Sequence, residues 1–135
     1  SGDIHKDIKE QLDSNKDKRF AEESKQIAHQ MKSRLLQGRL DDFGELLGKA
    51  WDAKKKFSKK ISNKDLDSIY KYGIDNGALG GKLLGAGDGG YFLFYVPTRN
   101  KIKFIESIKR KKLFIEPFTF DDEGLRSWVT KDKYV

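Results

Sequence analysis

Residues 77–96 read Gly-Ala-Leu-Gly-Gly-Lys-Leu-Leu-Gly-Ala-Gly-Asp-Gly-Gly-Tyr-Phe-Leu-Phe-Tyr-Val, and this stretch decides the fold. Seven of the fourteen residues from 77 to 90 are glycine. Each ordered glycine loses more backbone freedom than any other residue, so this density suits a segment that must turn or approach something closely. The flanks are short, apolar and rich in residues favoured in strands. The pattern therefore predicts a strand, a glycine-rich loop and a second strand.

The loop has two interpretations on its spacing alone. Successive exposed backbone N–H groups form a concave site for anions, and glycine leaves room for a phosphate to reach them. Lys82 adds a mobile positive charge nearby. On this interpretation the loop lines a nucleotide or sugar-phosphate cleft. The alternative is a flexible hairpin connection, and glycine spacing by itself does not separate the two.

Three known glycine patterns do not fit the loop. Gly85, Gly87 and Gly90 match G-x-G-x-x-G, but a dinucleotide-binding turn must open a helix, whereas residues 91–96 are predicted to form a strand. The protein-kinase loop does lie between strands, yet the chain has no V-A-I-K, H-R-D or D-F-G sequence. A Walker A lysine is followed by Ser or Thr, and here Leu83 follows Lys82.

Residues 80–95 resemble the third, C-terminal motif of the GHMP kinases, a superfamily that includes galactokinase and the homoserine, mevalonate and phosphomevalonate kinases. The upstream sequence narrows this resemblance to the sugar kinases that act on D-glycero-D-manno-heptose phosphate. Four segments carry it: Leu-Leu-Gly-Lys-Ala-Trp-Asp-Ala-Lys-Lys at 46–55, Ile-Ser-Asn at 61–63, Ile-Tyr at 69–70 and Asn-Gly-Ala-Leu-Gly-Gly-Lys at 76–82. The resemblance covers residues 27–128, which is most of the chain.

The resemblance implies a binding site and its ligands. It assigns substrate or nucleotide binding to residues of the loop and of a Trp-x-x-Lys-Lys stretch: Gly81, Lys82, Gly85, Ala86, Gly87, Asp88, Gly89, Gly90, Lys54 and Lys55. It implies ATP and Mg²⁺ as cofactors of the complete enzyme, and a sugar-phosphate substrate, D-glycero-D-manno-heptose 7-phosphate. By sequence alone, the two lysines of the Trp-x-x-Lys-Lys stretch also fit a solvated helix face.

The chain departs from the family pattern in two places. Asp88 stands where the family loop usually carries glycine, which adds a carboxylate beside the expected phosphate site. This carboxylate could face away, pair with a lysine or help to hold magnesium. Nothing in the chain matches the family's N-terminal substrate motif or the Gly/Ser-rich loop that wraps the ATP phosphates. We therefore expect the C-terminal domain of such a kinase, without its N-terminal kinase domain and inactive alone. No catalytic residue is assigned.

Length and composition bound the remaining possibilities. The 135 residues suit one domain. We expect residues 1–16 to hold a tag remnant, Ser1-Gly2, and a polar helix that can be loosely ordered, and the resemblance implies a GHMP kinase C-terminal domain over 17–135. The absence of cysteine excludes disulfides and thiolate metal sites and fits a reducing cytoplasm. No apolar run approaches the roughly 20 residues of a membrane span. His5 and His29 lie too far apart to suggest a metal pair, so no metal site is expected.

The net charge of +7 raises the hypothesis of an anionic partner. The alternative function is a stand-alone, non-catalytic phosphate- or RNA-binding α+β module that presents aromatic residues of 91–95 on its sheet. However, the chain lacks the RNP1 pattern, and the aromatic run is continuously apolar, which favours burial. Nucleic acid is therefore not the expected partner.

Hydrophobic periodicity predicts the order of elements. Helices are expected over 3–15, 17–37, 40–57 and from about 62 to 75, followed by the two strands around the loop, a helix over about 99–111, and strands over 113–120 and 125–129. Such an order predicts an α+β fold with the N-terminal helices packed on a small antiparallel sheet. The resemblance implies the same architecture, a ferredoxin-like GHMP kinase C-terminal domain.

Several single residues have expected structural roles. Trp51 is expected to anchor the core, and Gly44 and Gly48 to mark close packing, because glycine otherwise weakens a helix. Ser62 is expected to cap the helix that follows it. Ile102, Ile105 and Ile108 are expected to form the inward stripe of the 99–111 helix, assisted by Phe104.

Overall fold

The computed structural model describes residues 3, 4, 6, 8, 15–85 and 90–117, and the described residues before 15 are helical. Four longer helices follow: α2 (Asn15–Leu36), α3 (Leu40–Phe57), α4 (Lys64–Asp75) and α5 (Lys101–Arg110). Two short 3₁₀ turns, η1 (Lys59–Ile61) and η2 (Thr98–Asn100), precede α4 and α5. β1 (Gly80–Leu84) and β2 (Tyr91–Tyr95) pair antiparallel, with Gly80 opposite Tyr95 and Leu84 opposite Tyr91. The predicted α+β class is confirmed.

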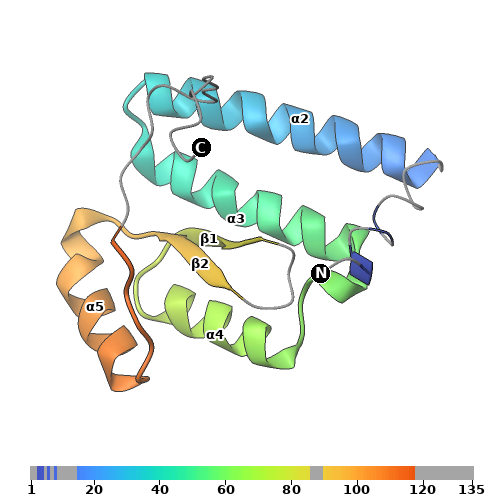
Figure 1. The fold of residues 1–135 in the computed structure, drawn as a ribbon. Coiled ribbons are helices and arrows are strands. Elements are labelled where there is room, and N and C mark those ends of the chain that lie inside the picture. Colours follow the sequence, from blue (N-terminus) through green and yellow to red (C-terminus); the bar gives the residue numbers. More distant parts are fainter. Residues whose placement is uncertain (1–2, 5, 7, 9–14, 86–89, 118–135) are drawn as a thin grey trace, which may run out of the picture.

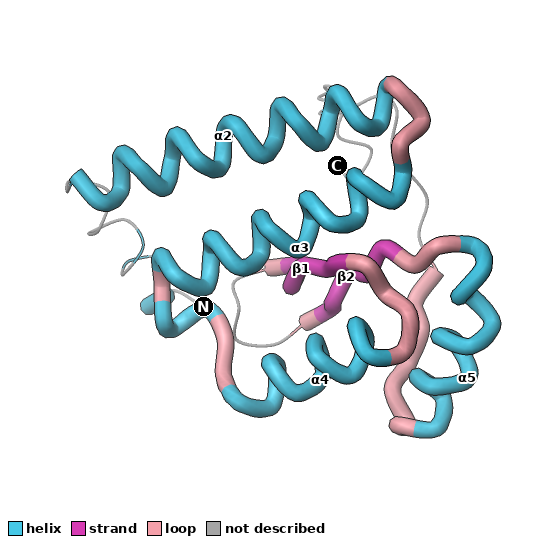
Figure 2. Tube along the Cα trace, turned by 180° about the vertical axis from the view of Figure 1, so that it is seen from behind, coloured by secondary structure: helices cyan, strands magenta, loops and turns pink. Residues whose placement is uncertain are grey.

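The elements stack in layers (Figure 1). α2 and α3 form an antiparallel helical hairpin that turns at Gly38, whose φ of 71° suits glycine. α3 lies between α2 and the sheet, α4 lies on the other side of the sheet, and α5 flanks one end; Figure 2 shows the same arrangement from behind. α3 and β1 run in the same direction, so the end of α3 lies beside the end of β1 that enters the loop.

Trp51 anchors the core, as predicted. Its side chain is 0% exposed and packs with Ile61 and Leu83. The ring of Phe92 meets it edge-on, with 6.1 Å between the ring centroids. Two further clusters join α2 to α3 and α4 to α5: Ile27, Leu46 and Ala53 in the first, and Ala78, Phe104 and Ile108 in the second.

The glycines of α3 allow this helix to touch the sheet. A β-carbon at Gly44 would overlap the ring of Tyr95. One at Gly48 would lie 3.1 Å from the Tyr70 hydroxyl oxygen and 3.3 Å from the Cα of Gly80. The predicted close packing is therefore confirmed, and it sets the short distance between the axis of α3 and β1.

The cap of α4 differs from the prediction by one residue. Asn63 is the N-cap, and its Oδ1 accepts a hydrogen bond of 2.9 Å from the backbone N–H of Leu66. Ser62 instead donates its hydroxyl to Asp67 at 2.8 Å. The capping role expected for Ser62 was wrong because asparagine caps a helix as well as serine does, and the two residues are adjacent.

The strand predicted over 113–120 was wrong for its described part, since residues 113–117 form neither helix nor strand. The chain turns sharply after α5 at Lys112, whose φ is 57°, and the Leu113 N–H then bonds the Ile108 carbonyl at 3.2 Å. Leu113 packs on the α4–α5 cluster, whereas Phe114 is 95% exposed. The remainder of this strand and the strand predicted over 125–129 lie outside the described residues.

The inward face of α5 also differs from the prediction. Phe104 and Ile108 are buried, but Ile102 is 76% exposed. Two residues along a helix correspond to about 200° of rotation, so Ile102 points away from the face that carries Phe104. Ser107 completes the buried face by donating its hydroxyl to the Phe104 carbonyl at 2.6 Å.

Candidate functional site

The glycine-rich loop leaves β1 and enters β2 through two glycines in conformations that other residues rarely adopt. Gly85 has a φ of 94° and Gly90 a φ of 121°. A β-carbon at Gly90 would also lie 3.0 Å from the Leu84 carbonyl oxygen. The predicted strand–loop–strand is confirmed by these two ends. Four of the predicted site residues, Ala86, Gly87, Asp88 and Gly89, lie outside the described residues.

The two faces of the hairpin have different surroundings. Gly81 lies against the ring of Phe94, which in turn fills the space beside Gly73 of α4. Phe92 and Phe94 also contact the ring of Tyr70, at 6.1 and 5.9 Å between centroids. These two aromatic rings therefore pack against α4 and are half-buried, whereas Tyr91 is exposed, so the burial expected for the whole run is seen only in part.

Lys82 lies on the opposite face of β1. Side chains alternate along a strand, so Lys82 shares a face with Gly80, the residue against which α3 packs. Lys82 stands opposite Leu93 in the register and is half-buried. The side chain of Lys82 therefore leaves the strand on the side of the sheet that α3 covers.

Lys54 lies in the last turn of α3 and is half-buried. Burial, and then repulsion by the charge of Lys82, lower the pKa of Lys54 below its ordinary value. Within the described part of the chain, neither ammonium forms an ion pair with a carboxylate. Lys54 and Lys82, both predicted as site residues, are thus half-buried cations that have no carboxylate partner among the described residues.

Lys55 has a different environment although it is adjacent in sequence. Its Nζ lies 3.6 Å from Oδ1 of Asp67 and 3.9 Å from Oδ1 of Asp52. It also lies over the rings of Trp51 and Tyr70, 5.9 and 5.6 Å from their centroids. These contacts hold Lys55 on the α4 side, so its charge is already compensated by the protein.

Tyr70 is a residue that the sequence analysis assigned only to the core. Its hydroxyl occupies the space left by the missing side chain of Gly48. Burial, and then the charge of Asp52, raise its pKa, while a hydrogen bond from the backbone of Gly81 acts in the opposite direction. The hydroxyl therefore lies where α3, α4 and the beginning of β1 meet. The sequence around Tyr70 gives no sign of this role, because the glycines that the hydroxyl meets belong to α3 and β1, which are distant from Tyr70 in sequence.

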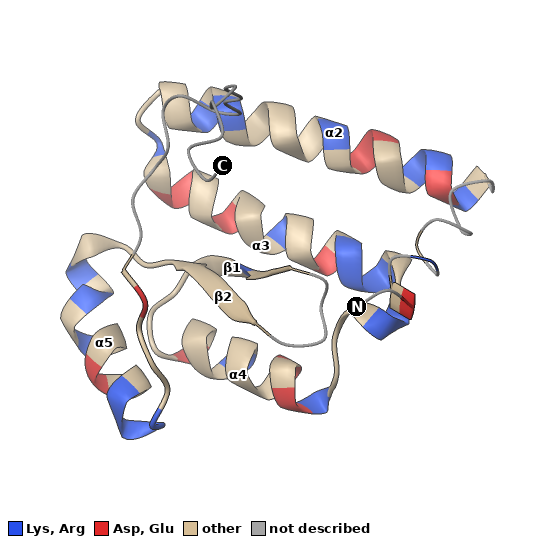
Figure 3. Cartoon of the chain, viewed as in Figure 1, with Lys and Arg blue, Asp and Glu red and all other residues tan. Residues whose placement is uncertain are grey.

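The assembled site is suited to binding an anion. Basic side chains gather at the C-terminal end of α3, next to the loop (Figure 3). Among the residues that the structure describes, no three His, Asp or Glu side chains come together in a way that would hold a metal ion. The described helices include none that is both long and apolar enough to cross a membrane. Among the described residues, this end of the sheet offers basic side chains and the two glycines that end the loop, Gly85 and Gly90.

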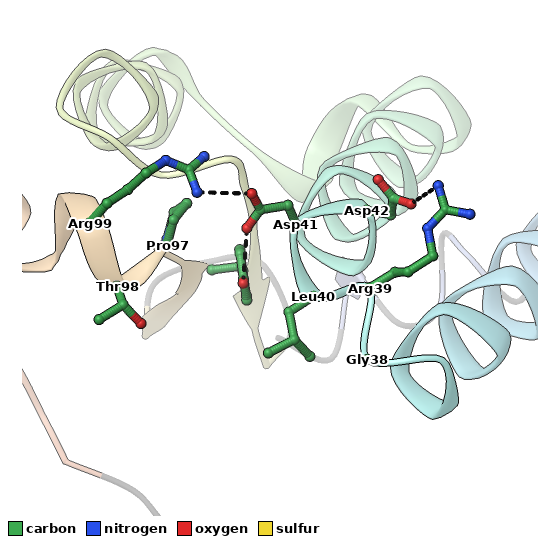
Figure 4. A pocket seen from close by; sticks show the side chains of 9 residues that line it. Gly38, Arg39, Leu40, Asp41, Asp42, Pro97, Thr98 and Arg99 are labelled. Atoms are coloured by element: carbon green, nitrogen blue, oxygen red, sulfur yellow. Dashed lines mark hydrogen bonds and ion pairs between the residues drawn. The ribbon is translucent and has the colours of Figure 1, made fainter.

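A hollow of about 470 Å³ lies at the other end of the sheet, where α3 begins and β2 ends. Asp41 accepts hydrogen bonds there from the Tyr95 hydroxyl at 3.2 Å and from Nη1 of Arg99 at 2.9 Å, and Arg39 pairs with Asp42 (Figure 4). Each arginine thus meets a carboxylate, and no net charge remains for an anion. The sequence analysis missed this hollow because its two halves are far apart along the chain.

Three comparisons with known proteins agree with one another. A family model described as "GHMP kinases C terminal" matches residues 24–112. The chain is 36% identical over 126 residues to a D-glycero-alpha-D-manno-heptose 7-phosphate kinase of Campylobacter jejuni, and the match covers 93% of this chain but 37% of that protein. A crystal structure of L. major mevalonate kinase in complex with R-mevalonate has the same fold, with a TM-score of 0.71, 24% identity, and coverage of 82% of this chain and 34% of that one.

Proposed function

Because this chain belongs to the GHMP kinase C-terminal family, we propose that it forms one wall of the phosphoryl-transfer cleft of a sugar kinase. The proposed substrate is a sugar phosphate, D-glycero-D-manno-heptose 7-phosphate. The observation that carries this proposal is the 36% identity to the heptose 7-phosphate kinase over 93% of the chain. The chain spans 37% of that relative's length, so the proposal concerns a whole protein to which an N-terminal kinase domain contributes.

In this proposal the chain's own residues bind and orient anionic groups. The loop from Gly85 to Gly90 brings its backbone N–H groups to the substrate or nucleotide. Such a close approach explains why the loop contains so many glycines despite the conformational entropy that each one loses. Lys82 and Lys54 balance negative charge from the side of α3. Gly81 keeps β1 close to α4, and Lys55 holds the end of α3 through its two carboxylate partners.

ATP, when bound, supplies the γ-phosphoryl group. Phosphoryl transfer depends mainly on positioning and on charge stabilisation. Lysine ammonium groups and backbone amides of this chain are donors that fit phosphate oxygens. The bond from the γ-phosphorus to the bridging oxygen breaks and ADP leaves, while a bond from the phosphorus to a sugar hydroxyl oxygen forms. The proton of that hydroxyl passes to a base of the N-terminal domain or to water. The described residues do not by themselves fit a Mg²⁺ site, so the proposal routes no step through a metal held by them.

The experiment compares the complete protein that carries this chain with the 135-residue chain alone. Each is incubated with ATP, Mg²⁺ and D-glycero-D-manno-heptose 7-phosphate, and phosphorus NMR follows the formation of a second sugar phosphate. We expect transfer by the complete protein and none by the chain alone. Heptose-dependent consumption of ATP by the chain alone would refute the proposed division between two domains. A complete protein that phosphorylates no sugar phosphate would refute the function itself.

A further inference from the structure

One face of α4 supports β2, the strand that follows the glycine-rich loop. Tyr70 and Gly73 are three residues apart in α4, so they lie on the same side of the helix. The ring centroid of Tyr70 lies 6.1 Å from that of Phe92 and 5.9 Å from that of Phe94. Phe94 also fills the space beside Gly73, where a β-carbon would overlap its ring. The two aromatic rings that β2 directs towards α4 therefore rest on this face.

The hydroxyl of Tyr70 lies at the contact between α3 and β1. A β-carbon at Gly48 would be 3.1 Å from this hydroxyl oxygen and 3.3 Å from the Cα of Gly80. The hydroxyl and Gly80 thus line one notch, which is open only because residue 48 has no side chain. Gly80 is the first residue of β1, the strand that leads into the loop. The Tyr70 side chain therefore packs on one flanking strand with its ring and lies beside the start of the other with its hydroxyl.

A cation restrains the Tyr70 ring. The Nζ of Lys55 lies 5.6 Å from the centroid of this ring and 3.6 Å from Oδ1 of Asp67, which also belongs to α4. A cation over the face of an aromatic ring is attracted to it. The last turn of α3 is thereby joined to the face of α4 that carries Tyr70. A side chain held by contacts on this many sides has the fixed rotamer that a positioning residue requires.

We propose that Tyr70 is a positioning residue of the transfer cleft, which sets the place of the glycine-rich loop by supporting β2 and filling the notch between α3 and β1. This inference rests on the proposed kinase function. The backbone N–H groups of the loop can meet a phosphate only where the two strands hold its ends, at Gly85 and Gly90. A misplacement of about 1 Å can cost about a hundredfold in the rate of a catalysed reaction. Tyr70 acts on the rate through the two strands and not by contact with the substrate.

The test compares the kinetics of the complete protein with those of Tyr70→Phe and Tyr72→Phe. Tyr72→Phe is the matched control, because Tyr72 lies on the same helix but donates its hydroxyl to the Ser107 carbonyl of α5 at 2.9 Å. We expect Tyr70→Phe to lower kcat about tenfold and to leave the KM for ATP and for heptose 7-phosphate within about twofold of the wild-type values. Tyr72→Phe unfolds at a lower urea concentration, since it loses a hydrogen bond, but it keeps the wild-type kcat.

Gly48→Ala tests the notch itself. Its methyl group would crowd both the Tyr70 hydroxyl and Gly80, so we expect a lower kcat in this variant as well. The double variant, Gly48→Ala with Tyr70→Phe, removes the hydroxyl that the methyl group meets. We expect it to recover about threefold in kcat over Gly48→Ala alone, because residues in contact do not act independently. A double variant slower than both single variants would overturn the proposal.

Nitrogen NMR of the complete protein with labelled glycines follows the loop without relying on turnover. We expect Tyr70→Phe to move the amide signals of Gly85 and Gly90, and Tyr72→Phe to leave them in place. Such shifts support the positioning role even in a protein that transfers no phosphoryl group. Unmoved signals in Tyr70→Phe, or a wild-type kcat of this variant in an active enzyme, reject the role and leave the proposed function standing. An equal loss of kcat in Tyr72→Phe also rejects it, because that loss would reflect general destabilisation.

Discussion

Gly80 of β1 lies directly against Gly44 of α3, so closely that a β-carbon at Gly80 would overlap the Gly44 carbonyl oxygen. The backbone N of Gly48 would be 2.8 Å from the same β-carbon. Backbone atoms cannot rotate away as a flexible side chain can, so the helix and the strand have no room for even a methyl group. This contact sets the position of α3, and with it the position of Lys54.

Gly80→Ala should therefore destabilise the fold by about 2 kcal/mol or more, the cost of overpacking at a rigid contact. The comparison is Gly38→Ala, where the β-carbon would meet nothing within 4 Å and only the φ of 71° opposes substitution. That conformational cost is about 1 kcal/mol. Urea unfolding of both variants measures the difference. Equal losses would show that the contact between α3 and β1 is not tight.

Trp51→Ala should cost about 3–5 kcal/mol in the free energy of unfolding, because it leaves a cavity between α3, β1 and η1. Trp51→Phe should cost clearly less. It keeps most of the ring, and it removes an indole N–H that has no hydrogen-bond partner among the described residues. Denaturant unfolding followed by far-UV circular dichroism checks both variants. A Trp51→Phe loss as large as that of Trp51→Ala would contradict the packing described.

Lys54→Met should stabilise the protein slightly at pH 7. The folded state binds the Lys54 proton less tightly than the unfolded state, because burial and Lys82 lower its pKa from 10.5. At neutral pH Lys54 is protonated in both the folded and the unfolded state, so the full free-energy cost of burying and repelling its charge falls on the folded state. Solvent screening keeps the gain below about 1 kcal/mol.

Raising the pH towards 10.5 releases this proton from the folded state first, so the wild-type protein gains stability relative to Lys54→Met and the difference shrinks. Urea unfolding at about pH 7 and at about pH 10 measures this change. Lys49→Met serves as the control, with no gain expected at either pH. A gain for Lys54→Met that grows with pH would contradict the proposed repulsion.

Asp41→Asn should lower the pKa of Tyr95 towards its ordinary value of 10.0. Burial comes first among the causes that raise this pKa, followed by the hydrogen bond to Asp41 and its charge, while Arg99 opposes them. The folded state therefore keeps the Tyr95 proton longer than the unfolded state. The stability that this provides is complete below about pH 10 and is lost as the pH rises further.

Carbon NMR of labelled tyrosine rings follows the Tyr95 titration directly. Asp42→Asn is the matched control, because Asp42 lines the same hollow but pairs with Arg39. We expect a lower Tyr95 pKa in Asp41→Asn and no change in Asp42→Asn. The same titration curve in all three proteins would show that Asp41 does not act on Tyr95.

The fold was largely predictable because its helices and strands carry strong local patterns. The helices around residues 17–75, the hairpin and the buried Trp51 were all predicted from periodicity, capping residues and glycines. The strand expected over 113–120 failed in its described part because an apolar run does not show whether a partner strand is available. The inward face of α5 was predicted in part: Phe104 and Ile108 are buried as expected, but Ile102, at the start of the predicted stripe, is exposed.

The residues of the candidate site were named from the sequence, but which of its lysines pair with carboxylates could not be predicted. The sequence places Lys54 and Lys55 side by side, and nothing local distinguishes them. The structure separates them because Asp52, Asp67 and two aromatic rings hold Lys55, whereas Lys54 has no carboxylate partner among the described residues. Asp67 and the ring of Tyr70 belong to α4, so only the packed fold reveals which lysine is paired.

The central claim, that the glycine turn lines the transfer cleft, is tested most directly by one pair of variants in the complete protein. Gly90→Val and Gly38→Val each place a branched side chain on a left-handed glycine, with φ of 121° and 71°, but only Gly90 belongs to the loop. The measurement is kcat for phosphoryl transfer from ATP to heptose 7-phosphate. We predict that Gly90→Val abolishes transfer while Gly38→Val keeps it near the wild-type value. Wild-type kcat in Gly90→Val would contradict the account and leave the loop as a hairpin connection only.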